Sequence, residues 1–229
     1  MEGPTPAPPS SEPTVVEEDG ATQDAPVGTT VNGSPSTRER LLTTAASLFH
    51  ERGYAGTTTR EIAREVGIEK ASLYHYIDGK EDLLYDLCSN SLRHIRQGAE
   101  CVLARESDPT RQLQLVIEAH IKSSLANRDI HATMLLELRC LSPERRRRVI
   151  QMRDDYEEIL RGVTARCQAS GALRADIEPK LLTLALLNLL NWTIFWFNPG
   201  GEYTPERVAD VLYQLYLQGA GPRPVAAGG

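Results

Sequence analysis

The stretch TTTREIAREVGIEKASLYHYIDGKEDLL, residues 57–84 of this 229-residue chain, contains the start and stop signals of two short helices. Thr58 followed by Glu61 matches the capping-box pattern that begins a helix, and Gly67 is the residue type that commonly ends one. After this glycine, the segment KASLYHY at residues 70–76 predicts a second short helix. Two short helices joined by a glycine-containing turn predict a helix-turn-helix unit.

The sequence on both sides of this unit is also helical in pattern. Ser36 with Glu39 repeats the capping box and opens a supporting helix that Gly53 ends, and Asp78 with Glu81 predicts the cap of a long helix. Longer helices are expected over residues 79–104, 109–127, 129–140, 142–169, 181–197 and 205–219. No stretch shows a sustained period-two alternation of β-branched residues. The sequence therefore predicts an all-α fold of about nine helices, with a three-helix head and a larger helical domain.

The chain is acidic only because of its first segment. The net charge of −6 and the pI of about 5.5 ordinarily argue against a nucleic-acid partner. Residues 1–36 contain six carboxylates and no Lys or Arg, so the rest of the chain holds 25 basic and 25 acidic residues. Residues 37–85 alone hold seven basic and eight acidic residues. Nucleic-acid binding by this segment would therefore depend on where a few donors are placed and not on basic composition.

The two ends of the chain have a composition that favours disorder. Residues 1–36 are rich in Pro, Gly, Ser and Thr and have few large apolar side chains, and residues 220–229 are similar. Such segments cannot bury enough surface to offset their conformational entropy. Alternatively, the acidic first segment is an arm that competes with DNA for the basic surface of the protein.

Cysteine usage and apolar runs exclude several other classes of protein. The four cysteines form no CxxC pair, which argues against a zinc site or a disulfide framework. The apolar run at residues 181–197 is shorter than the ~20 residues that span a bilayer, and no signal-peptide pattern opens the chain. His94, His120 and His131 lack the spacing of metal ligands and are expected in the core or in a pocket. We therefore expect a cytoplasmic protein without membrane contact, metal ion or cofactor.

The second short helix has one apolar and one polar face. Leu73 and Ile77 are four residues apart and are expected to pack inward with Ile68. The opposite face then presents Lys70, Ser72, Tyr74, His75 and the edge of Tyr76. In a helix-turn-helix this face enters the major groove, where hydroxyl, imidazole and ammonium groups suit contacts with phosphates and base edges.

Basic groups from neighbouring helices converge on the same face. Arg60 lies in the first turn of its helix beside Thr58 and Thr59, whose free hydroxyls and backbone N–H groups favour a phosphate. Lys80 lies at the start of the next long helix, where the helix dipole adds to its charge. Alternatively, Lys80 is only a solvated charge, and the two tyrosines of the second short helix seal the small three-helix core.

This segment resembles the helix-turn-helix of TetR-family transcriptional regulators. The resemblance covers about residues 37–85 and rests on Thr58-Thr59-Arg60, Gly67, Leu73-Tyr74-His75-Tyr76 and Lys80-Glu81-Asp82-Leu83, with Tyr76 where Phe is usual. It implies phosphate contacts by Thr59, Tyr74, His75 and Lys80, and base-edge contacts by Lys70, Ala71 and Ser72. Arg60 is expected near a base or a phosphate. The residues expected at the DNA interface are therefore Thr58, Thr59, Arg60, Lys70, Ala71, Ser72, Tyr74, His75, Tyr76 and Lys80.

Beyond residue 85 the resemblance implies architecture alone. It implies a helical effector pocket and a homodimer formed by the eighth and ninth helices, both within residues 86–219. Two such helical hairpins would pack as a four-helix bundle. The apolar residues expected in this bundle are Leu182, Leu186, Leu189, Leu190, Val208, Val211, Leu212 and Leu215. A dimer also explains how two weak half-site contacts give tight binding to a palindromic operator.

The aromatic segment NWTIFWFNPGG, residues 191–201, suggests an apolar ligand. The residues expected to bind it are Asn188, Asn191, Trp192, Phe195 and Trp196, with an asparagine as the polar orienting group; alternatively, the aromatic residues fill the core or an interface. The ending Trp196-Phe197-x-Pro-Gly-Gly resembles a subset of TetR proteins that respond to acyl-CoA thioesters. In that case Arg145 to Arg148 could attract the CoA phosphates. The competing interpretation is a solvated helix start paired with Asp154, Asp155, Glu157 and Glu158.

The sequence thus predicts a ligand-responsive, homodimeric transcriptional repressor. It would bind a palindromic DNA operator and be released by a small apolar or acyl-CoA-type effector. The alternatives are a transcriptional activator of the same family, a non-specific architectural DNA-binding protein and a helical enzyme that uses the pocket. No nucleophile elbow, metal cluster, phosphate loop or paired-carboxylate motif supports the enzyme.

Overall fold

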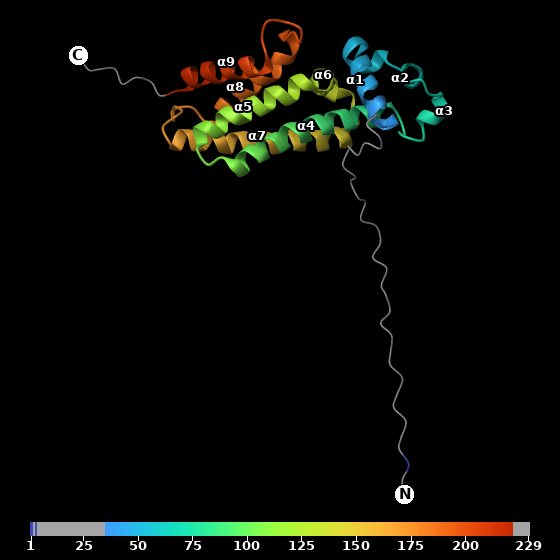
Figure 1. Ribbon diagram of the computed structural model, residues 1–229, viewed down its shortest axis with the longest axis horizontal. Coiled ribbons are helices and arrows are strands. Elements are labelled where there is room, and N and C mark those ends of the chain that lie inside the picture. Colours follow the sequence, from blue (N-terminus) through green and yellow to red (C-terminus); the bar gives the residue numbers. More distant parts are fainter. Residues whose placement is uncertain (2, 4–34, 222–229) are drawn as a thin grey trace, which may run out of the picture. The chain divides into compact units, whose positions relative to one another are not determined.

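Nine α-helices and one short 3₁₀ helix build the described residues of the computed structural model, which are Met1, Gly3 and residues 35–221 (Figure 1). The elements are α1 Thr37–Gly56, α2 Thr59–Val66, α3 Lys70–Leu73, α4 Lys80–Arg105, α5 Pro109–Ala126, α6 Arg128–Glu137, η1 Leu138–Cys140, α7 Pro143–Ala169, α8 Pro179–Trp196 and α9 Pro205–Ala220. No strand occurs in these residues, and the predicted all-α fold is confirmed. The predicted tails, residues 1–36 and 220–229, lie almost entirely outside the described residues. None of the described helices combines the length and the hydropathy that a membrane span requires.

The predicted starts of α1 and α2 are confirmed by their hydrogen bonds. Ser36 Oγ accepts from the backbone N–H of Glu39 at 3.2 Å, and Glu39 Oε2 accepts from the backbone N–H of Ser36 at 2.6 Å. Thr58 and Glu61 form the same reciprocal pair at 3.2 and 2.8 Å. Gly67 ends α2 with a φ of 77°, a left-handed conformation that residues with a Cβ rarely adopt. The resulting tight turn connects the two short helices.

The start of α4 differs from the predicted cap by Asp78 and Glu81. Asp82 Oδ2 accepts from the backbone N–H groups of Asp78 and Gly79, at 2.7 and 3.0 Å. Glu81 Oε1 accepts instead from the backbone N–H of Ser142, next to the start of α7, at 2.8 Å. The predicted cap is wrong because α4 begins one residue later than the sequence pattern indicates, which gives the capping position to the next carboxylate. Glu81 is thereby free to connect α4 with α7.

Helix α3 ends at Leu73, three residues before its predicted end. The backbone N–H of His75 donates to Ser72 O at 3.2 Å, and that of Tyr76 donates to Leu73 O at 2.9 Å. These bonds span three residues instead of four, so the chain continues as a tight turn. Leu73 and Ile77 are both buried, as predicted.

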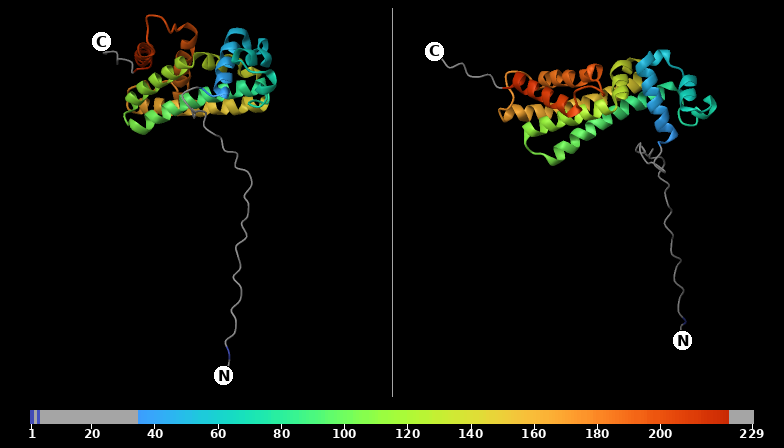
Figure 2. Two further views of the ribbon diagram at one scale, coloured as in Figure 1. Left: turned by 45° about the vertical axis from the view of Figure 1, so that its right-hand side comes forward. Right: turned by 45° about the horizontal axis from the view of Figure 1, so that its top comes forward.

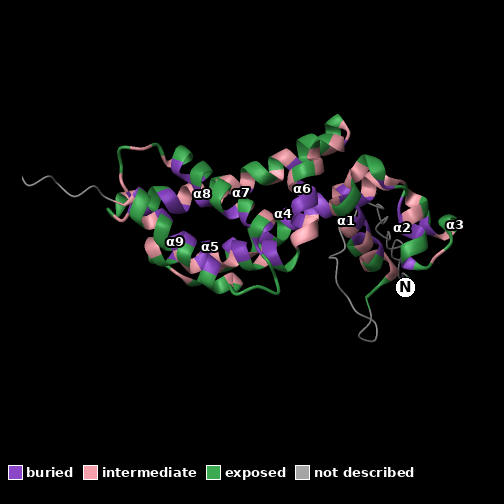
Figure 3. Ribbon diagram, turned by 90° about the horizontal axis from the view of Figure 1, so that it is seen from above, coloured by how far each residue is buried: buried purple, intermediate pink, exposed green. Residues whose placement is uncertain are grey.

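Helix α4 connects the helix-turn-helix with the larger helical region. Figures 1 and 2 show α1, α2 and α3 gathered at the beginning of α4, whereas α5 and α7 pack along its length. One hydrophobic core contains side chains of α1 to α4 and continues into α6 and α7 through Met134, Tyr156 and Leu160. A second core joins α5, α7, α8 and α9. Figure 3 shows the buried residues of both cores on the sides of the helices that face one another.

The apolar residues of α8 and α9 divide between two faces. Five of those predicted for a dimer interface are buried in the second core of the chain itself: Leu182, Leu186, Leu190, Val208 and Leu212. Leu189, Val211 and Leu215 are exposed on the outside. The prediction is wrong for the five buried residues. A helix that is apolar over most of its surface packs one face into the core of its own chain, and side chains on that face cannot contact a partner subunit.

Candidate nucleic-acid interface and ligand cavity

The buried side chains of the helix-turn-helix place its polar residues on the outside. Because Leu73 and Ile77 face the core, the residues between them turn away from it. Tyr74 and Tyr76 are 47% and 43% exposed. The alternative in which these two tyrosines seal the core is therefore wrong. Arg38 stabilises the turn, since its Nη1 donates to the backbone oxygen of Tyr76 at 3.5 Å.

Four exposed polar side chains make up a surface that we call the donor face. They are Arg60 of α2, Lys70 of α3, and Tyr74 and His75 of the turn that follows α3. Lys70 Nζ lies 6.0 Å from the centre of the Tyr74 ring, so a cation and an aromatic ring lie side by side. Within the described residues, neither Arg60 nor Lys70 forms a salt bridge, although the neighbouring Arg64 pairs with Glu65. The two positive charges are therefore available to phosphates.

The other residues expected at the interface differ in their exposure and in whether their polar atoms are already hydrogen-bonded within the protein. Ala71 is exposed, and Thr59 and Ser72 are half-buried beside the donor face. The hydroxyl of Thr58 is not free as predicted, because it donates to Glu61 Oε2 at 2.7 Å and accepts from the Glu61 N–H. The hydroxyl and the backbone N–H of Thr58 both donate to the Glu61 carboxylate and thereby lower the pKa of Glu61. Thr58 thus fixes the start of α2 and turns its oxygen toward its own helix.

Lys80 is anchored within the protein. Its Nζ donates to the backbone oxygens of Tyr54 and Thr57, both at 2.7 Å, and lies 4.1 Å from the centre of the Tyr54 ring. Burial lowers the pKa of Lys80, and nearby anionic groups oppose the decrease. The alternative of a merely solvated charge is wrong, because two of the three N–H groups of Lys80 join α4 to the end of α1.

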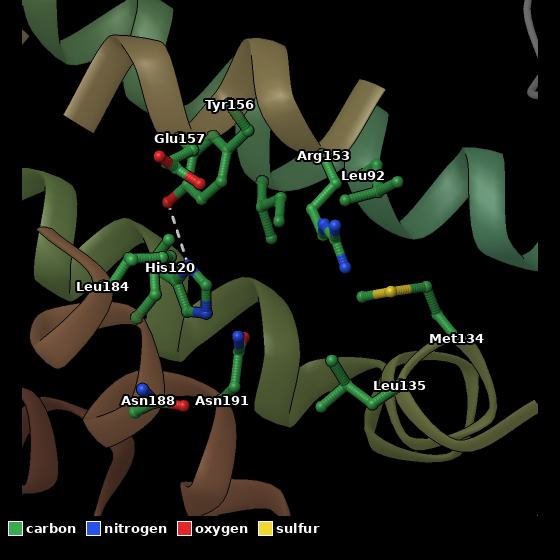
Figure 4. A pocket seen from close by; sticks show the side chains of 12 residues that line it. Leu92, His120, Met134, Leu135, Arg153, Tyr156, Glu157, Leu184, Asn188 and Asn191 are labelled. Atoms are coloured by element: carbon green, nitrogen blue, oxygen red, sulfur yellow. Dashed lines mark hydrogen bonds between the residues drawn. The ribbon is translucent and has the colours of Figure 1, made fainter. Parts of the chain in front are cut away.

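A cavity of about 290 Å³ lies among five helices of the larger region (Figure 4). It is lined by Leu92 and Ile95 of α4, His120 of α5, Met134 and Leu135 of α6, Arg153, Tyr156 and Glu157 of α7, and Leu184, Leu187, Asn188 and Asn191 of α8. His120 and Tyr156 are buried, whereas Arg153, Leu184 and Asn188 are exposed. The cavity therefore has a buried end and an open rim between α7 and α8.

The buried end carries a small hydrogen-bond network. His120 Nδ1 and the hydroxyl of Tyr156 are 2.9 Å apart, and the dashed line in Figure 4 marks this hydrogen bond. His131 lies behind this pair, with its ring edge-on to that of His120 at 5.7 Å. Its Nδ1 is 2.9 Å from Ser91 Oγ, and its Nε2 is 3.2 Å from Asn191 Oδ1. Both ring nitrogens of His131 thus have partners within the chain.

Burial keeps this network neutral. It lowers the pKa of His120 to about 3, with His131 adding to the decrease and Asn191 opposing it. It also lowers the pKa of His131 to about 4 and raises the pKa of Tyr156. Both imidazoles are therefore uncharged near pH 7 and can each donate one hydrogen bond and accept one.

The structure brings only part of the predicted ligand set to the cavity. Asn188 and Asn191 line it, as Figure 4 shows. Trp192 and Trp196 are exposed on the outer side of α8, and Phe195 packs on Trp192 with ring centres 4.7 Å apart. These three aromatic residues do not line the cavity: Trp192 and Trp196 turn outward, and Phe195 is half-buried against the second core.

Three cavity residues were not singled out for a ligand by the sequence. Tyr156, Arg153 and Glu157 all lie on α7, whose polar pattern indicates a solvated helix. A lone tyrosine at a buried position of that helix was the one available signal. His120 was expected in the core or in a pocket, and it lies in both.

The four consecutive arginines at the start of α7 are divided in their contacts. Arg145 forms a salt bridge with Asp82 of α4, and its guanidinium lies 5.5 Å from the centre of the Tyr85 ring. Arg148 pairs with Glu144 of its own helix at 2.7 Å. The predicted pairing with the later carboxylates of α7 is therefore wrong for these two arginines. Arg145 acts as a connection between α7 and α4.

Two family models match this chain. The model "Bacterial regulatory proteins, tetR family" matches residues 41–87, which contain the donor face. The model "Tetracyclin repressor-like, C-terminal domain" matches residues 106–220, which contain most of the cavity. Together they cover most of the described helices.

Individual relatives agree with the family models over most of the chain. The repressor KstR2 of Rhodococcus jostii is 28% identical over 189 residues, which are 82% of this chain and 93% of that protein. The crystal structure of the TetR-family regulator PfmR of Thermus thermophilus is 36% identical, with a TM-score of 0.74 over 81% of this chain and all of that one. AibR, solved with isovaleryl coenzyme A and operator DNA, is 25% identical, with a TM-score of 0.71 over 79% of this chain and 97% of its own.

The helix-turn-helix, the cavity-containing helical region and these matches lead to one conclusion. The chain belongs to the TetR family of DNA-binding transcriptional regulators and is not an enzyme.

Proposed function

We propose that this protein is a transcriptional repressor that binds a palindromic operator as a homodimer and is released by an acyl-CoA-type effector. The observation that carries the proposal is the donor face, where Arg60 and Lys70 project from the helix-turn-helix without salt bridges to other described residues. The named activities of KstR2, a repressor, and of AibR, a protein crystallised with an acyl-CoA and operator DNA, support it. Such a repressor would act in the cytoplasm.

In this proposal the donor face follows one DNA groove. Tyr74 and His75 would contact phosphates together with Thr59, while Lys70 would reach base edges. Ser72 and Ala71 would lie along the same edges, and Arg60 would contact a base or a phosphate. Lys80 would contact the DNA only through its third N–H group, because the other two are hydrogen-bonded within the protein. Binding would remain strongly salt-dependent, with a slope of log K against log salt concentration of roughly −0.9 per phosphate neutralised.

The dimensions of the cavity support an effector whose apolar part enters and whose polar part remains outside. Its volume of about 290 Å³ is at the lower limit for ligand pockets, which range over roughly 300–1,000 Å³. A short acyl group fits this space, whereas a complete coenzyme A does not. Arg153 at the exposed rim would then lie nearest to the coenzyme portion, and Arg146 and Arg147 are exposed farther along α7.

The proposal is tested by binding the full-length protein to DNA fragments from its own promoter region. We expect a footprint with two-fold symmetry, and we expect micromolar isovaleryl-CoA or a longer acyl-CoA to dissociate the complex. Lys70→Ala should weaken binding to the operator by about 1–3 kcal/mol and relax the base preference at the position that Lys70 contacts. Arg93→Ala, which removes an exposed arginine of α4 that hydrogen-bonds Asn90, is the matched control and should change neither.

Two results would contradict the proposal. Equal binding of wild type and Lys70→Ala to every DNA sequence tested would exclude the donor face as the interface. Persistence of the complex with all acyl-CoA thioesters would exclude that effector class while leaving DNA binding intact.

A further inference from the structure

We infer that the effector carries a neutral hydrogen-bond acceptor of the carbonyl class, which binds the Nε2–H of His120 at the buried end of the cavity. The inference rests on the proposed function, because it assumes that this cavity holds the effector. It adds the chemistry by which the site recognises the buried part of that molecule and assigns the recognition to a single atom.

His120 Nε2 is a buried polar atom with no partner at hydrogen-bonding distance among the described residues, although the side chain of Asn191, which opposes the decrease in the pKa of His120, lies beside the ring. The residue is 1% exposed, and it lines the cavity. Ser89 Oγ and His50 Nδ1 are the other described side-chain atoms in this condition, and neither residue lines the cavity. A buried donor left unpaired destabilises the protein by its lost hydration, and a bound ligand that accepts its hydrogen bond removes this penalty. His120 Nε2 is therefore placed to hydrogen-bond a ligand in the cavity.

The hydrogen bond on the opposite side of the ring determines which proton Nε2 carries. Burial raises the pKa of Tyr156, so its hydroxyl keeps its proton. The only acceptor that this hydroxyl contacts among the described residues is His120 Nδ1, at 2.9 Å. When Tyr156 donates to Nδ1, the neutral imidazole carries its proton on Nε2. His120 therefore offers a donor to the cavity, and Tyr156 is the positioning residue that fixes this tautomer.

The surroundings of His120 favour a neutral acceptor over a carboxylate. Among the residues that line the cavity, the only permanent cation is Arg153, whose side chain is 54% exposed at the rim. Glu157 adds a negative charge on the same helix. A carboxylate at the buried end would lose its hydration without a counter-ion, which costs several kcal/mol, whereas a carbonyl oxygen requires one donor. Leu92, Ile95 and Met134 supply the apolar contacts for the rest of the acyl group.

The inference can be tested without coenzyme A, using cyclohexanone and methylenecyclohexane as probes. These molecules have nearly the same shape, but only the ketone has an acceptor. Their affinities for the wild-type protein and for His120→Phe are measured by NMR titration. We expect the ketone-to-alkene affinity ratio to fall about three- to tenfold in the variant, which corresponds to one net hydrogen bond. Met134→Leu removes a neighbouring lining side chain without changing the donor and should leave the ratio unchanged.

A second measurement needs no variant. Side-chain ¹⁵N NMR of the full-length wild type at pH 7 should show His120 protonated at Nε2 and not at Nδ1, with a shift of the Nε2 resonance on addition of cyclohexanone but not of the alkene. A proton on Nδ1, or an affinity ratio that is the same in His120→Phe, would overturn the inference. If the ketone preference holds while no acyl-CoA releases the operator, the proposed effector is wrong and the inference stands. If an acyl-CoA releases the operator but the ketone preference is the same in His120→Phe, the inference is wrong and the proposed function stands.

Discussion

Lys80 stabilises the head from within at a position where the family resemblance implies a DNA contact. Two of its N–H groups reach the backbone oxygens of Tyr54 and Thr57, and its charge lies over the Tyr54 ring. The same ammonium that could bind a phosphate therefore closes the joint between α1, α2 and α4. Lys70, in contrast, contacts only the ring of Tyr74 and is exposed.

The two lysines should respond differently to removal. We expect Lys80→Ala to lower the free energy of unfolding by about 1–3 kcal/mol, because two partly buried carbonyl groups lose a charged donor. Lys70→Ala should change it by less than about 0.5 kcal/mol, since an exposed lysine without a salt bridge contributes little. Urea unfolding at pH 7 measures both. Equal stability of the wild type and Lys80→Ala would show that these hydrogen bonds are not formed in solution.

The buried histidines make stability depend on pH in a definite direction. In the unfolded chain a histidine has a pKa of about 6.5, whereas burial lowers the pKa of His120 to about 3 and that of His131 to about 4. Above pH 6.5 both states are neutral and stability is complete. As the pH falls below 6.5, the unfolded state takes up protons that the native state excludes, so stability is lost from about pH 6.5 down to about pH 4 for His131 and about pH 3 for His120.

This linkage should measurably lower the free energy of unfolding at pH 5, which is above the range in which most carboxylates titrate. Each of the two histidines should lower the free energy of unfolding by up to about 2 kcal/mol between pH 7 and pH 5. His75→Ala, which removes an exposed histidine of the donor face, should leave this difference unchanged. Urea unfolding at the two pH values gives the comparison. A wild type equally stable at both would mean that His120 and His131 are accessible to protons in the native state.

At the scale of elements, α4 and α7 each extend from the cavity to the helix-turn-helix. Helix α4 contributes Leu92 to the cavity, and its first turn contains Lys80 and Asp82. Helix α7 contributes Tyr156 to the cavity, and its first turn contains Arg145, which binds Asp82. A ligand that moves either helix therefore acts on the pair at the start of α4. This is the physical route by which an effector could change the position of the donor face.

Arg145 is the residue on which this connection depends. We expect Arg145→Ala to destabilise the protein by about 1–2 kcal/mol, because Asp82, which also caps α4, loses a partly buried partner. Arg148→Ala removes the next exposed ion pair of the same helix and should cost less than about 0.5 kcal/mol. Thermal unfolding distinguishes the two variants. Indistinguishable melting temperatures would assign the Arg145 contact to the solvated surface.

At the scale of the whole molecule, α8 and α9 present an apolar surface that the chain itself does not cover. Trp196 and Tyr203 border a groove of about 390 Å³ with Val211 and Leu215, and Trp192 lies exposed on the same helix as Trp196. Large exposed apolar patches on soluble proteins mark interaction sites. In a homodimer the same surface would meet its symmetry mate.

A single charge on this surface should separate the subunits. We expect Leu215→Glu to convert a dimer into monomers in sedimentation and to weaken operator binding at least tenfold, because one half-site contact alone remains. Leu136→Glu is the matched control: Leu136 of α6 is 50% exposed and Leu215 is 57% exposed, but Leu136 lies outside the groove. The control should remain dimeric. Dimeric Leu215→Glu protein would place the subunit interface elsewhere.

The sequence predicted best those features that depend on neighbours along the chain. The capping boxes at Ser36 and Thr58 and the turn at Gly67 are local hydrogen-bond patterns, and all three are confirmed. The cap by Asp78 is wrong because two nearby carboxylates compete for the same N–H groups, and a contact with Ser142 decides between them. Periodicity also could not divide the apolar residues of α8 between the core of the chain and its exposed face.

The all-α fold, the helix-turn-helix and the family could be predicted from the sequence, because caps, glycine turns and helical periodicity act between residues a few positions apart. The chemistry of the cavity, in contrast, arises only in the packed chain. His120 and Tyr156 are 36 residues apart and meet only when α5 packs on α7. The same holds for Lys80, whose partners come from the end of α1. Burial determines the protonation state of such groups and which of their hydrogen-bonding atoms lack a partner. Burial is a property of the packed molecule and not of any segment.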